Sequence, residues 1–304
     1  MNRTMTAFEW ALLVVLSVLW GTSFLFITIA AHDLPPLSIA AVKVALAAMA
    51  LLLAMRLRGI ALPQAGRTWR AFAIMGLFND AGPFVLIAFA NPFVPTGLAS
   101  VLIATSPLFT VVLAHVLTED ERMTPRHVAG TAIGFGGLAL MLGGDVVALT
   151  PPAILGQLAC LLAALGYAFA SVYGRRFAGL SLHPITTAAG QLSTSALALV
   201  PLALWLDRPW LLPVPGLPAI GALLGLGLLT GALAYAIFFR ILATAGATNA
   251  VLVTFMSPIT AILLGIALLG ERLTRQQLGG MALVGVGIAV LDGRLLSAVR
   301  RRAT

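Results

Sequence analysis

Long apolar stretches follow one another along the 304-residue chain, separated by short segments that contain proline, glycine or charge. A helix that crosses a bilayer needs about 20 mostly apolar residues. Ten stretches reach or approach this length, so the sequence predicts an all-α integral membrane protein with ten transmembrane helices and no soluble domain. The predicted spans are residues 8–31, 36–55, 69–90, 94–117, 125–143, 152–174, 183–206, 216–239, 247–269 and 275–292.

The composition argues against several other classes of protein. Charged residues make up 9% of the chain, whereas ordinary soluble chains carry about 25%. The net charge of +8 comes from arginines in the short segments, with no basic stripe interleaved with aromatics, so we expect no nucleic-acid partner. The single cysteine, Cys160, and the four scattered histidines lack metal-ligand spacing, so we expect no metal ion and no cofactor. The first stretch is longer than the roughly 7–15-residue core of a signal peptide, and we expect it to be retained.

The arginines predict the orientation, because cytoplasmic segments of membrane proteins are enriched in Lys and Arg. With the N-terminus inside the cell, 14 arginines fall on the cytoplasmic side, and three (Arg208, Arg272 and Arg275) fall on the other. We therefore expect a multi-pass protein of the cell inner membrane with both termini in the cytoplasm.

The chain contains an internal repeat. A charged hinge, DERMTPRHVAG at 120–130, recurs as GERLTRQQLGG at 270–280, and LASVLIATSPLFTVVL at 98–113 parallels NAVLVTFMSPITAILL at 249–264. The repeat predicts two five-helix halves, residues 1–148 and 149–304. Because five is odd, the second half must enter the membrane upside down. Inverted repeats of this kind are typical of secondary transporters, in which they support alternating access to a central site.

These features resemble the EamA family of the drug/metabolite transporter superfamily. The resemblance rests on the two five-span halves, WGTSF at 20–24, the paired Ser-Pro helices and the Glu-Arg-x-Thr hinge, and it covers essentially the whole chain. Within the family, the chain is most similar to bacterial aromatic amino-acid exporters of the YddG type. The resemblance implies a basket of spans 1–4 and 6–9 around a central cavity, with spans 5 and 10 packed at its side.

Charged and amide side chains inside the spans are the first candidates for a substrate site, because such groups are costly in a bilayer. Lys43 is the only lysine, and its repeat equivalent is Gln191. Lys43 could attract a substrate carboxylate, or it could reach outward to the headgroups or pair with Asp33 or Asp80. Both interpretations remain open from the sequence.

Asn79 and Asp80 lie halfway along the third span, whereas their equivalents are Leu228 and Leu229. This asymmetry is expected where a substrate or a proton binds. Asp80 could bind a substrate ammonium, exchange a proton, or form a fixed ion pair with Lys43.

The repeated Ser106-Pro107 and Ser257-Pro258 pairs lie near the middle of spans four and nine. A proline removes one backbone donor and crowds the carbonyl four residues earlier, which predicts kinks there. Unpaired carbonyls at this depth are tolerated where they are buried in protein or face water. We therefore expect these pairs either to shape the cavity and gate it or to serve packing alone.

Aromatic side chains could line the cavity and stack on a substrate. The candidates are Trp20, Phe24, Phe78 and Phe84 from the first half and Tyr167, Tyr173 and Tyr235 from the second. For any one of them, packing or contact with lipid is the competing interpretation.

Taken with the resemblance, these residues predict export of a small zwitterion with an apolar or aromatic side chain, such as an amino acid. Other metabolites or cationic drugs are the alternative, the latter if Lys43 points away from Asp80. A membrane enzyme would need a nucleophile–base set or metal ligands, and a channel would need a repeated filter ring. The sequence contains neither, and it has no GxxxxGK[ST] loop for ATP. Uniport and proton antiport both remain open, and we expect a monomer.

The repeated hinge itself is expected to bind nothing. Thr124 and Thr274 are good N-caps for spans five and ten, and Gln277 would complete a capping box after Thr274. The Glu-Arg pairs before them would keep charge in the headgroup layer.

Overall fold

The computed structural model describes residues 6–117, 124–142, 150–174, 176–177, 182–245 and 253–292, and these ranges contain helices and no β-strand. In the first half the helices are α1 (Ala7–Ala30), α2 (Pro36–Leu57), α3 (Gly66–Gly76), η1 (Leu77–Ala81), α4 (Gly82–Ala90), α5 (Thr96–Ile103), α6 (Ser106–Leu117) and α7 (Pro125–Leu142). In the second half they are α8 (Pro151–Gly174), α9 (Pro184–Leu206), η3 (Pro209–Leu211), α10 (Leu217–Leu224), η4 (Gly225–Leu233), α11 (Ala234–Ala245), α13 (Val253–Leu269) and α14 (Arg275–Asp292).

Helices occupy the described part of every predicted apolar stretch. Within the described residues, seven helices are long and apolar enough to cross a membrane, which agrees with the prediction of an all-α membrane protein. Three further apolar segments are shorter, at Val128–Gly137, Met256–Leu269 and Leu278–Gly287. Large apolar side chains on the outer surface, such as Leu53, Leu197 and Leu263, are exposed, as expected for a surface that faces lipid.

The fourth stretch is interrupted near its proline. Helix α5 ends at Ile103, the residue whose carbonyl Pro107 was predicted to crowd, and α6 begins at Ser106. Thr105 lies fully buried in the break, and its hydroxyl donates to the Leu102 carbonyl at 2.6 Å. By contrast, α13 continues through Pro258 without interruption, and the Ser257 hydroxyl there donates to the Val253 carbonyl at 2.9 Å. The two Ser-Pro pairs therefore differ in local structure.

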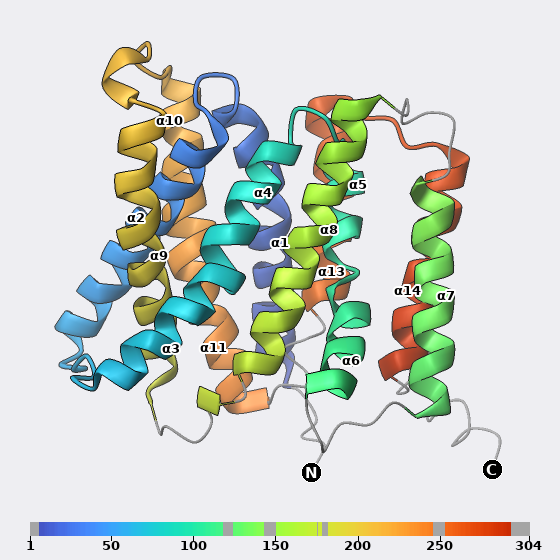
Figure 1. Ribbon diagram of the computed structural model, residues 1–304, viewed down its shortest axis with the longest axis horizontal. Helices are drawn as coiled ribbons and strands as arrows, with labels where there is room; N and C mark the ends of the chain where they lie inside the picture. Colours follow the sequence, from blue (N-terminus) through green and yellow to red (C-terminus); the bar gives the residue numbers. More distant parts are fainter. Residues whose placement is uncertain are drawn as a thin grey trace.

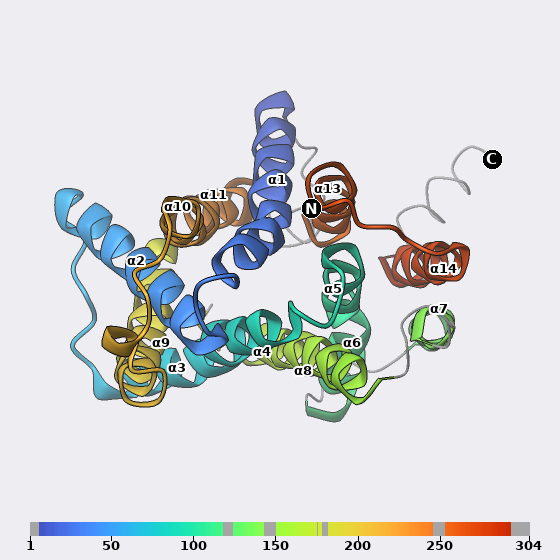
Figure 2. The ribbon, with the colours of Figure 1, turned by 90° about the horizontal axis from the view of Figure 1, so that it is seen from above.

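Helices α7 and α14 pack side by side at one end of the molecule, away from the other helices (Figure 2). A Cβ added at Gly287 would lie 2.5 Å from the Gly134 amide nitrogen, and one added at Gly137 would lie 2.6 Å from the Val284 amide nitrogen. Glycines allow this close approach of two backbones, which favours helix association within a membrane. Both helices begin directly after Thr124 and Thr274, as predicted for N-caps. The side chain of Gln277 lies outside the described residues.

The larger group of helices is built around α2 and α9, which pack against each other along their length (Figure 1). Their contact is rich in buried alanines, among them Ala40, Ala47, Ala188 and Ala189. Small side chains again allow a close approach of the two helices.

Carboxylates tie helix ends together at the upper end of the view in Figure 1. Asp207, at the end of α9, accepts hydrogen bonds from the Ser38 amide at 2.8 Å and the Ser38 hydroxyl at 2.6 Å. Asp33, in the α1–α2 loop, accepts one from the Gly216 amide at 2.8 Å. Both carboxylates thus accept a bond from a backbone amide at the start of a helix, where a negative charge is favoured.

Candidate functional site

Asp80 lies in a local distortion of the third apolar stretch. Residues Leu77–Ala81 form a π-helical segment, η1, between α3 and α4, and the equivalent part of the second half forms another, η4. Such segments are uncommon and occur frequently at functional sites. The sequence analysis did not predict them, although Gly76 and Gly82 flank η1 directly. The segment leaves the Asp80 side chain fully buried, with 0% exposure.

Asp80 forms hydrogen bonds with Asn79 and with Tyr235 of α11. The Tyr235 hydroxyl donates to Asp80 Oδ1 at 2.5 Å, and the Asn79 amide donates to the same oxygen at 3.4 Å. The Asn79 amide also lies 3.2 Å from the Tyr235 hydroxyl. Asp80 Oδ2 is buried and has no hydrogen-bond partner among the described residues. The cluster therefore offers an unused acceptor, and it joins residues from both halves of the chain.

The sequence predicted Tyr235 only as an aromatic wall, and its bond to Asp80 was missed. A signal was available, because the repeat equivalent of Tyr235 is Leu86. The asymmetry that singled out Asn79 and Asp80 thus applies equally to Tyr235.

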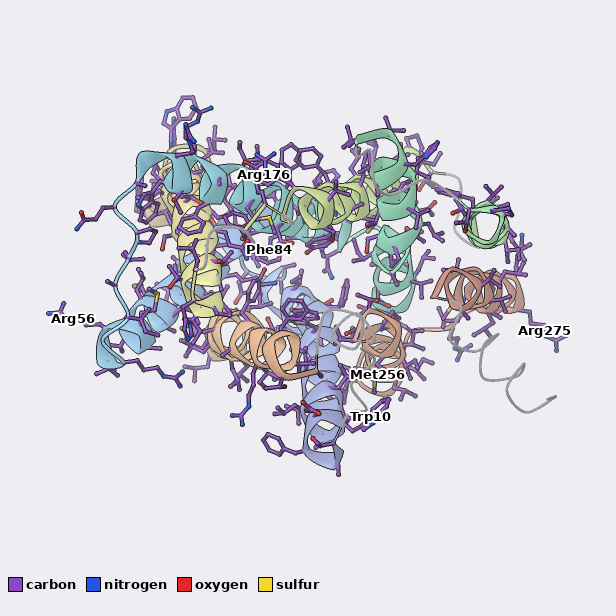
Figure 3. The ribbon with its side chains drawn as sticks, turned by 90° about the horizontal axis from the view of Figure 1, so that it is seen from below. Trp10, Arg56, Phe84, Arg176, Met256 and Arg275 are labelled. Atoms are coloured by element: carbon purple, nitrogen blue, oxygen red, sulfur yellow. The ribbon has the colours of Figure 1, made fainter. Side chains whose placement is uncertain are left out.

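Lys43 lies inside the molecule and does not reach outward, since its side chain is 7% exposed. Its ammonium nitrogen lies 3.6 Å from the centre of the Phe84 ring, a cation–π contact. Phe84 follows Asp80 by one helical turn and points into the interior, whereas Arg56 and Arg275 lie at the periphery (Figure 3). No salt bridge joins Lys43 to Asp80 in the described structure, so two buried groups of opposite charge lie near each other without direct contact.

Gln191 is 2% exposed and lies on α9, next to the start of the π-helical segment. Its backbone carbonyl accepts from the Ser195 hydroxyl at 2.9 Å, and the same hydroxyl lies 3.0 Å from the Gly76 carbonyl. The side-chain oxygen, Oε1, is buried and has no partner among the described residues. Gln191 thus supplies a second unused acceptor.

Two of the predicted aromatic residues lie beside this cluster. The Trp20 ring meets the Tyr235 ring edge-on at a centroid distance of 6.5 Å and lies 5.5 Å from the Phe238 ring. Tyr167 is partly buried and packs against the core formed by α2 and α9.

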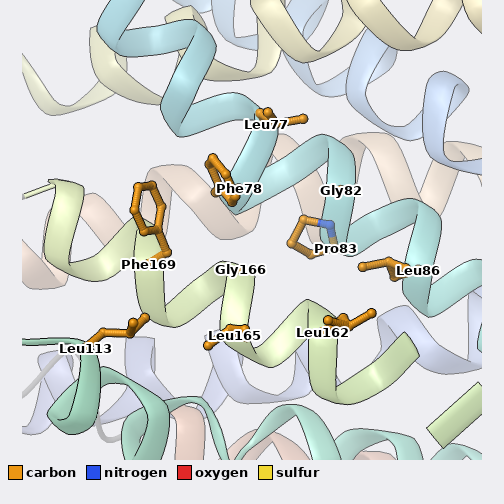
Figure 4. Close-up of a pocket in the computed structure, with 10 residues that line it drawn as sticks. All are labelled: Leu77, Phe78, Gly82, Pro83, Leu86, Leu113, Leu162, Leu165, Gly166 and Phe169. Carbon is orange, nitrogen blue, oxygen red and sulfur yellow. The ribbon is translucent and has the colours of Figure 1, made fainter. Parts of the chain in front are cut away.

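Phe78 lies elsewhere, although it is only two residues from Asp80. It is 37% exposed and packs on Phe169 at a centroid distance of 4.4 Å. Both rings line an apolar pocket of about 460 Å³ between α4 and α8 (Figure 4). The π-helical segment therefore directs Phe78 toward the outer surface and Asp80 toward the interior.

The predicted gating residues Ser106, Pro107, Ser257 and Pro258 form no hydrogen bond with the Asp80 cluster in the described structure. The described residues also contain no group of three or more His, Cys, Asp or Glu side chains placed to hold a metal ion. The contacts bring together Asp80, Asn79 and Tyr235, with Trp20 against the Tyr235 ring and Lys43 over the Phe84 ring. Gln191 lies on α9 beside Gly76, one turn before Asp80 in the chain.

Removal of the Tyr235 hydroxyl tests how this cluster is held. In Tyr235→Phe, Asp80 Oδ1 loses its shorter hydrogen bond, and a buried acceptor that loses its donor costs about 1–3 kcal/mol. We expect a lower melting temperature in detergent. Tyr167→Phe is the matched control, because its hydroxyl forms no hydrogen bond with Asp80 in the described structure. Equal losses in both variants would contradict the assignment.

Comparison with known proteins agrees with this architecture. The EamA-like transporter family matches residues 8–143 and 154–291. The uncharacterized inner membrane transporter YedA of Escherichia coli (strain K12) is 29% identical over 264 residues, covering 86% of this chain and 83% of that protein. The uncharacterized transporter YoaV of Bacillus subtilis (strain 168) is 25% identical over 286 residues, covering 91% and 94%.

A probable amino-acid metabolite efflux pump of Salmonella typhimurium (strain LT2) is 26% identical over 295 residues, covering 92% of each chain. A solved crystal structure superposes with a TM-score of 0.68 at 24% identity, covering 99% of this chain and 100% of the other, and this likeness concerns the fold alone. The family match extends over nearly the whole chain in two consecutive segments. This chain therefore belongs to the EamA-like transporter family.

Proposed function

We propose that this protein exports small zwitterionic metabolites, with amino acids as the first candidate substrates, by alternating access. The observation that carries the proposal is the pair of buried, oppositely charged groups, Asp80 and Lys43, which are not bonded to each other. Asp80 Oδ2 has no hydrogen-bond partner among the described residues, and Lys43 lies over a ring. Buried charges are costly unless they are paired, and a zwitterion would supply an ion-pair partner to each. Its ammonium would meet Asp80 Oδ2, and its carboxylate would draw Lys43 from the Phe84 ring.

The proposal includes a topology of ten spans in two inverted halves, residues 1–148 and 149–304. The helix contacts support it, because they come in matched pairs: α2 packs on α9 and α7 on α14, while α3 packs on α9 as η4 packs on α2. Helix α1 starts and α14 ends at the same side of the molecule (Figure 1). The arginine distribution makes this side cytoplasmic, in an inner membrane, and the paired halves form a complete bundle as a monomer.

The relatives support transport as the activity and leave the substrate open. One relative carries the name of a probable amino-acid metabolite efflux pump, and others are named only as transporters. Amino acids are therefore the first substrates to test.

A second candidate is a lipophilic amine, which the position of Lys43 favours. Lys43 lies over Phe84, and Asp80 Oδ2 has no hydrogen-bond partner among the described residues, so this oxygen can accept a bond from a substrate cation. Tyr235, Trp20 and Phe238 form an aromatic group beside it. A buried carboxylate with aromatic neighbours suits an ammonium on an apolar body.

Transport from proteoliposomes tests both candidates. Vesicles are loaded with a labelled aromatic amino acid, the amine formed by removing its carboxyl group, or the acid formed by removing its amino group, with protein-free vesicles as the control. We expect release of the amino acid above the control rate and no release of the deaminated acid. Release of the amine alone would favour the second candidate, and release of none of the three would contradict both.

The same vesicles, assayed with and without a pH gradient, test whether substrate export is coupled to proton movement. Stimulation of release by a gradient would indicate proton antiport. Equal rates would indicate uniport.

A further inference from the structure

Glu271, in the second copy of the repeated hinge, bonds directly to the start of α5. Its Oε1 accepts from the Thr96 amide at 2.6 Å and its Oε2 from the Gly97 amide at 3.0 Å. The sequence predicted that the hinge binds nothing, and it did not predict this contact within the chain. A free carboxylate at the start of a helix is favoured there, because the first amides of a helix lack backbone partners and carry partial positive charge.

We propose that Glu271 is a positioning residue of the transport cycle that holds α5 against α13 while the outer end of the protein is closed, and releases α5 when this end opens. The inference rests on the proposed topology, which places both partners at the outer end and in different halves. An opening between the halves at this end must separate Glu271 from Thr96 and Gly97.

Three glycines shape the place that Glu271 occupies. Gly270 has a φ of +66°, a left-handed conformation that turns the chain back after α13 and that glycine adopts without strain. A Cβ added at Gly265 would lie 2.5 Å from Glu271 Oε2, so a larger residue would displace the carboxylate. A Cβ at Gly97 would lie 3.2 Å from the Ile262 side chain, so glycine allows α5 to approach α13. The three glycines thus leave room for the Glu271 carboxylate beside the start of α5.

The first copy of the hinge lacks two of these glycines. Its sequence has Asp120 where the second copy has Gly270, and Ala114 stands where Gly265 is found. The hinge residues 118–123 lie outside the described residues. These two glycines therefore distinguish the second copy of the hinge, whereas the glutamate occurs in both copies.

Helix α5 is suited to move as a unit. It is eight residues long, and it ends at the break that precedes Ser106 and Pro107. All residues from Thr96 to Leu102 are buried, and the helix packs on α13 and α8. A short helix with a backbone break at one end and an ionic hydrogen bond at the other can swing about the break once that bond is lost. The proline break and the hinge glutamate then belong to the same gate.

Accessibility of a cysteine on α5 tests the proposal without any substrate. Cys160 is replaced by Ala. Ser100→Cys is then introduced in α5, one helical turn after Thr96, at a side chain that is 3% exposed. The protein is reconstituted, and a membrane-impermeant maleimide is applied from outside. We expect slow labelling in this background and labelling on the order of tenfold faster when Glu271→Gln is added, a factor comparable to the loss of a helix-capping bond.

Two variants separate a gate from a simple helix cap. Gly265→Ala keeps the charge of Glu271 and displaces its carboxylate, so it should accelerate labelling as Glu271→Gln does. Arg272→Gln alters the neighbouring hinge charge and should leave labelling unchanged. If Glu271→Gln and Gly265→Ala lower the melting temperature while Ser100→Cys reacts at the background rate, Glu271 is only a cap and the proposal is overturned.

A reference cysteine identifies the source of any failure. Val214→Cys lies in the α9–α10 loop and is 90% exposed, so it should react from outside in every variant. If Val214→Cys is protected from the external reagent, the proposed orientation is wrong, and the contact between Glu271 and α5 cannot lie at the outer end. If Val214→Cys reacts but no amino acid is transported, the substrate assignment is wrong. The role of Glu271 is then still decided by the labelling of Ser100→Cys alone.

Discussion

Asp80→Asn should reduce transport of any substrate that carries an ammonium group by about 30-fold or more. The substitution keeps the size of the side chain and its capacity to bond with Tyr235, but it removes the buried negative charge. Loss of one partner from a buried, hydrogen-bonded charge pair costs about 2–5 kcal/mol, and a factor of ten in affinity corresponds to about 1.4 kcal/mol. Initial export rates from loaded proteoliposomes measure the effect, with the protein amount normalised.

Glu9→Gln is the matched control for loss of one acidic charge. Glu9 lies half-buried at the start of α1, where it forms a capping box with Thr6, and it is far from the candidate site in sequence. Its replacement should leave export rates nearly unchanged. Export by Asp80→Asn at the rate of the unsubstituted protein would remove Asp80 from the substrate site.

The same variant tests the role of protons. If export is coupled to a proton through Asp80, then its dependence on a pH gradient should disappear in Asp80→Asn, because an amide does not exchange a proton in this range. An unchanged pH dependence in the variant would reject this role, whatever the effect on the rate.

Gly287→Leu and Gly137→Leu should separate α7 from α14 and lower the melting temperature of the protein. At both positions an added side chain would meet backbone atoms of the facing helix, at 2.5 and 2.6 Å, and a backbone cannot move aside as a side chain does. Overpacking of this kind costs about 1–3 kcal/mol or more. Thermal unfolding in a mild detergent, followed by circular dichroism, measures the change.

Gly285→Leu and Gly136→Leu provide controls on the same two helices. An added Cβ at either position has no neighbour within 4 Å, and both residues are exposed. These variants should melt close to the unsubstituted protein. If all four variants are equally destabilised, the effect comes from the loss of glycine itself and the close contact between the helices is not its cause.

The positions of the helices follow largely from hydropathy, which adds up over the residues of each apolar stretch. The positions of the apolar stretches predicted where the helices lie, because the cost of placing a polar group in hydrocarbon acts on every residue of a span. The proline at 107 predicted the region where α5 ends, since the loss of a backbone donor is a local effect. The repeat predicts which helices are equivalent, and this equivalence remains a prediction.

The candidate site was predicted only in part. Lys43, Asp80 and Gln191 could be selected from the sequence, because ionisable and amide groups are rare inside spans. Tyr235 was selected for its ring, while its hydroxyl proved to be the donor to Asp80. Phe78 was selected by the same argument as Trp20, and it lies on the other side of its helix in an apolar pocket.

The sequence by itself determined that this chain is a helical membrane protein and where its helices run, and it predicts that the two halves are related. Hydropathy adds up over the residues of a span, and glycine and proline act on the backbone at their own positions. Internal similarity is read directly by aligning the two halves of the sequence. Only the tertiary structure decided that Lys43 rests on Phe84, that Tyr235 reaches Asp80, and that Glu271 binds the start of α5. Each of these contacts joins segments that are distant in the sequence, and the first two depend on the rotation of a helix about its axis. The π-helical turn at Leu77–Ala81 supplies such a rotation for Asp80 and Phe78, and the apolar pattern along the chain does not record it.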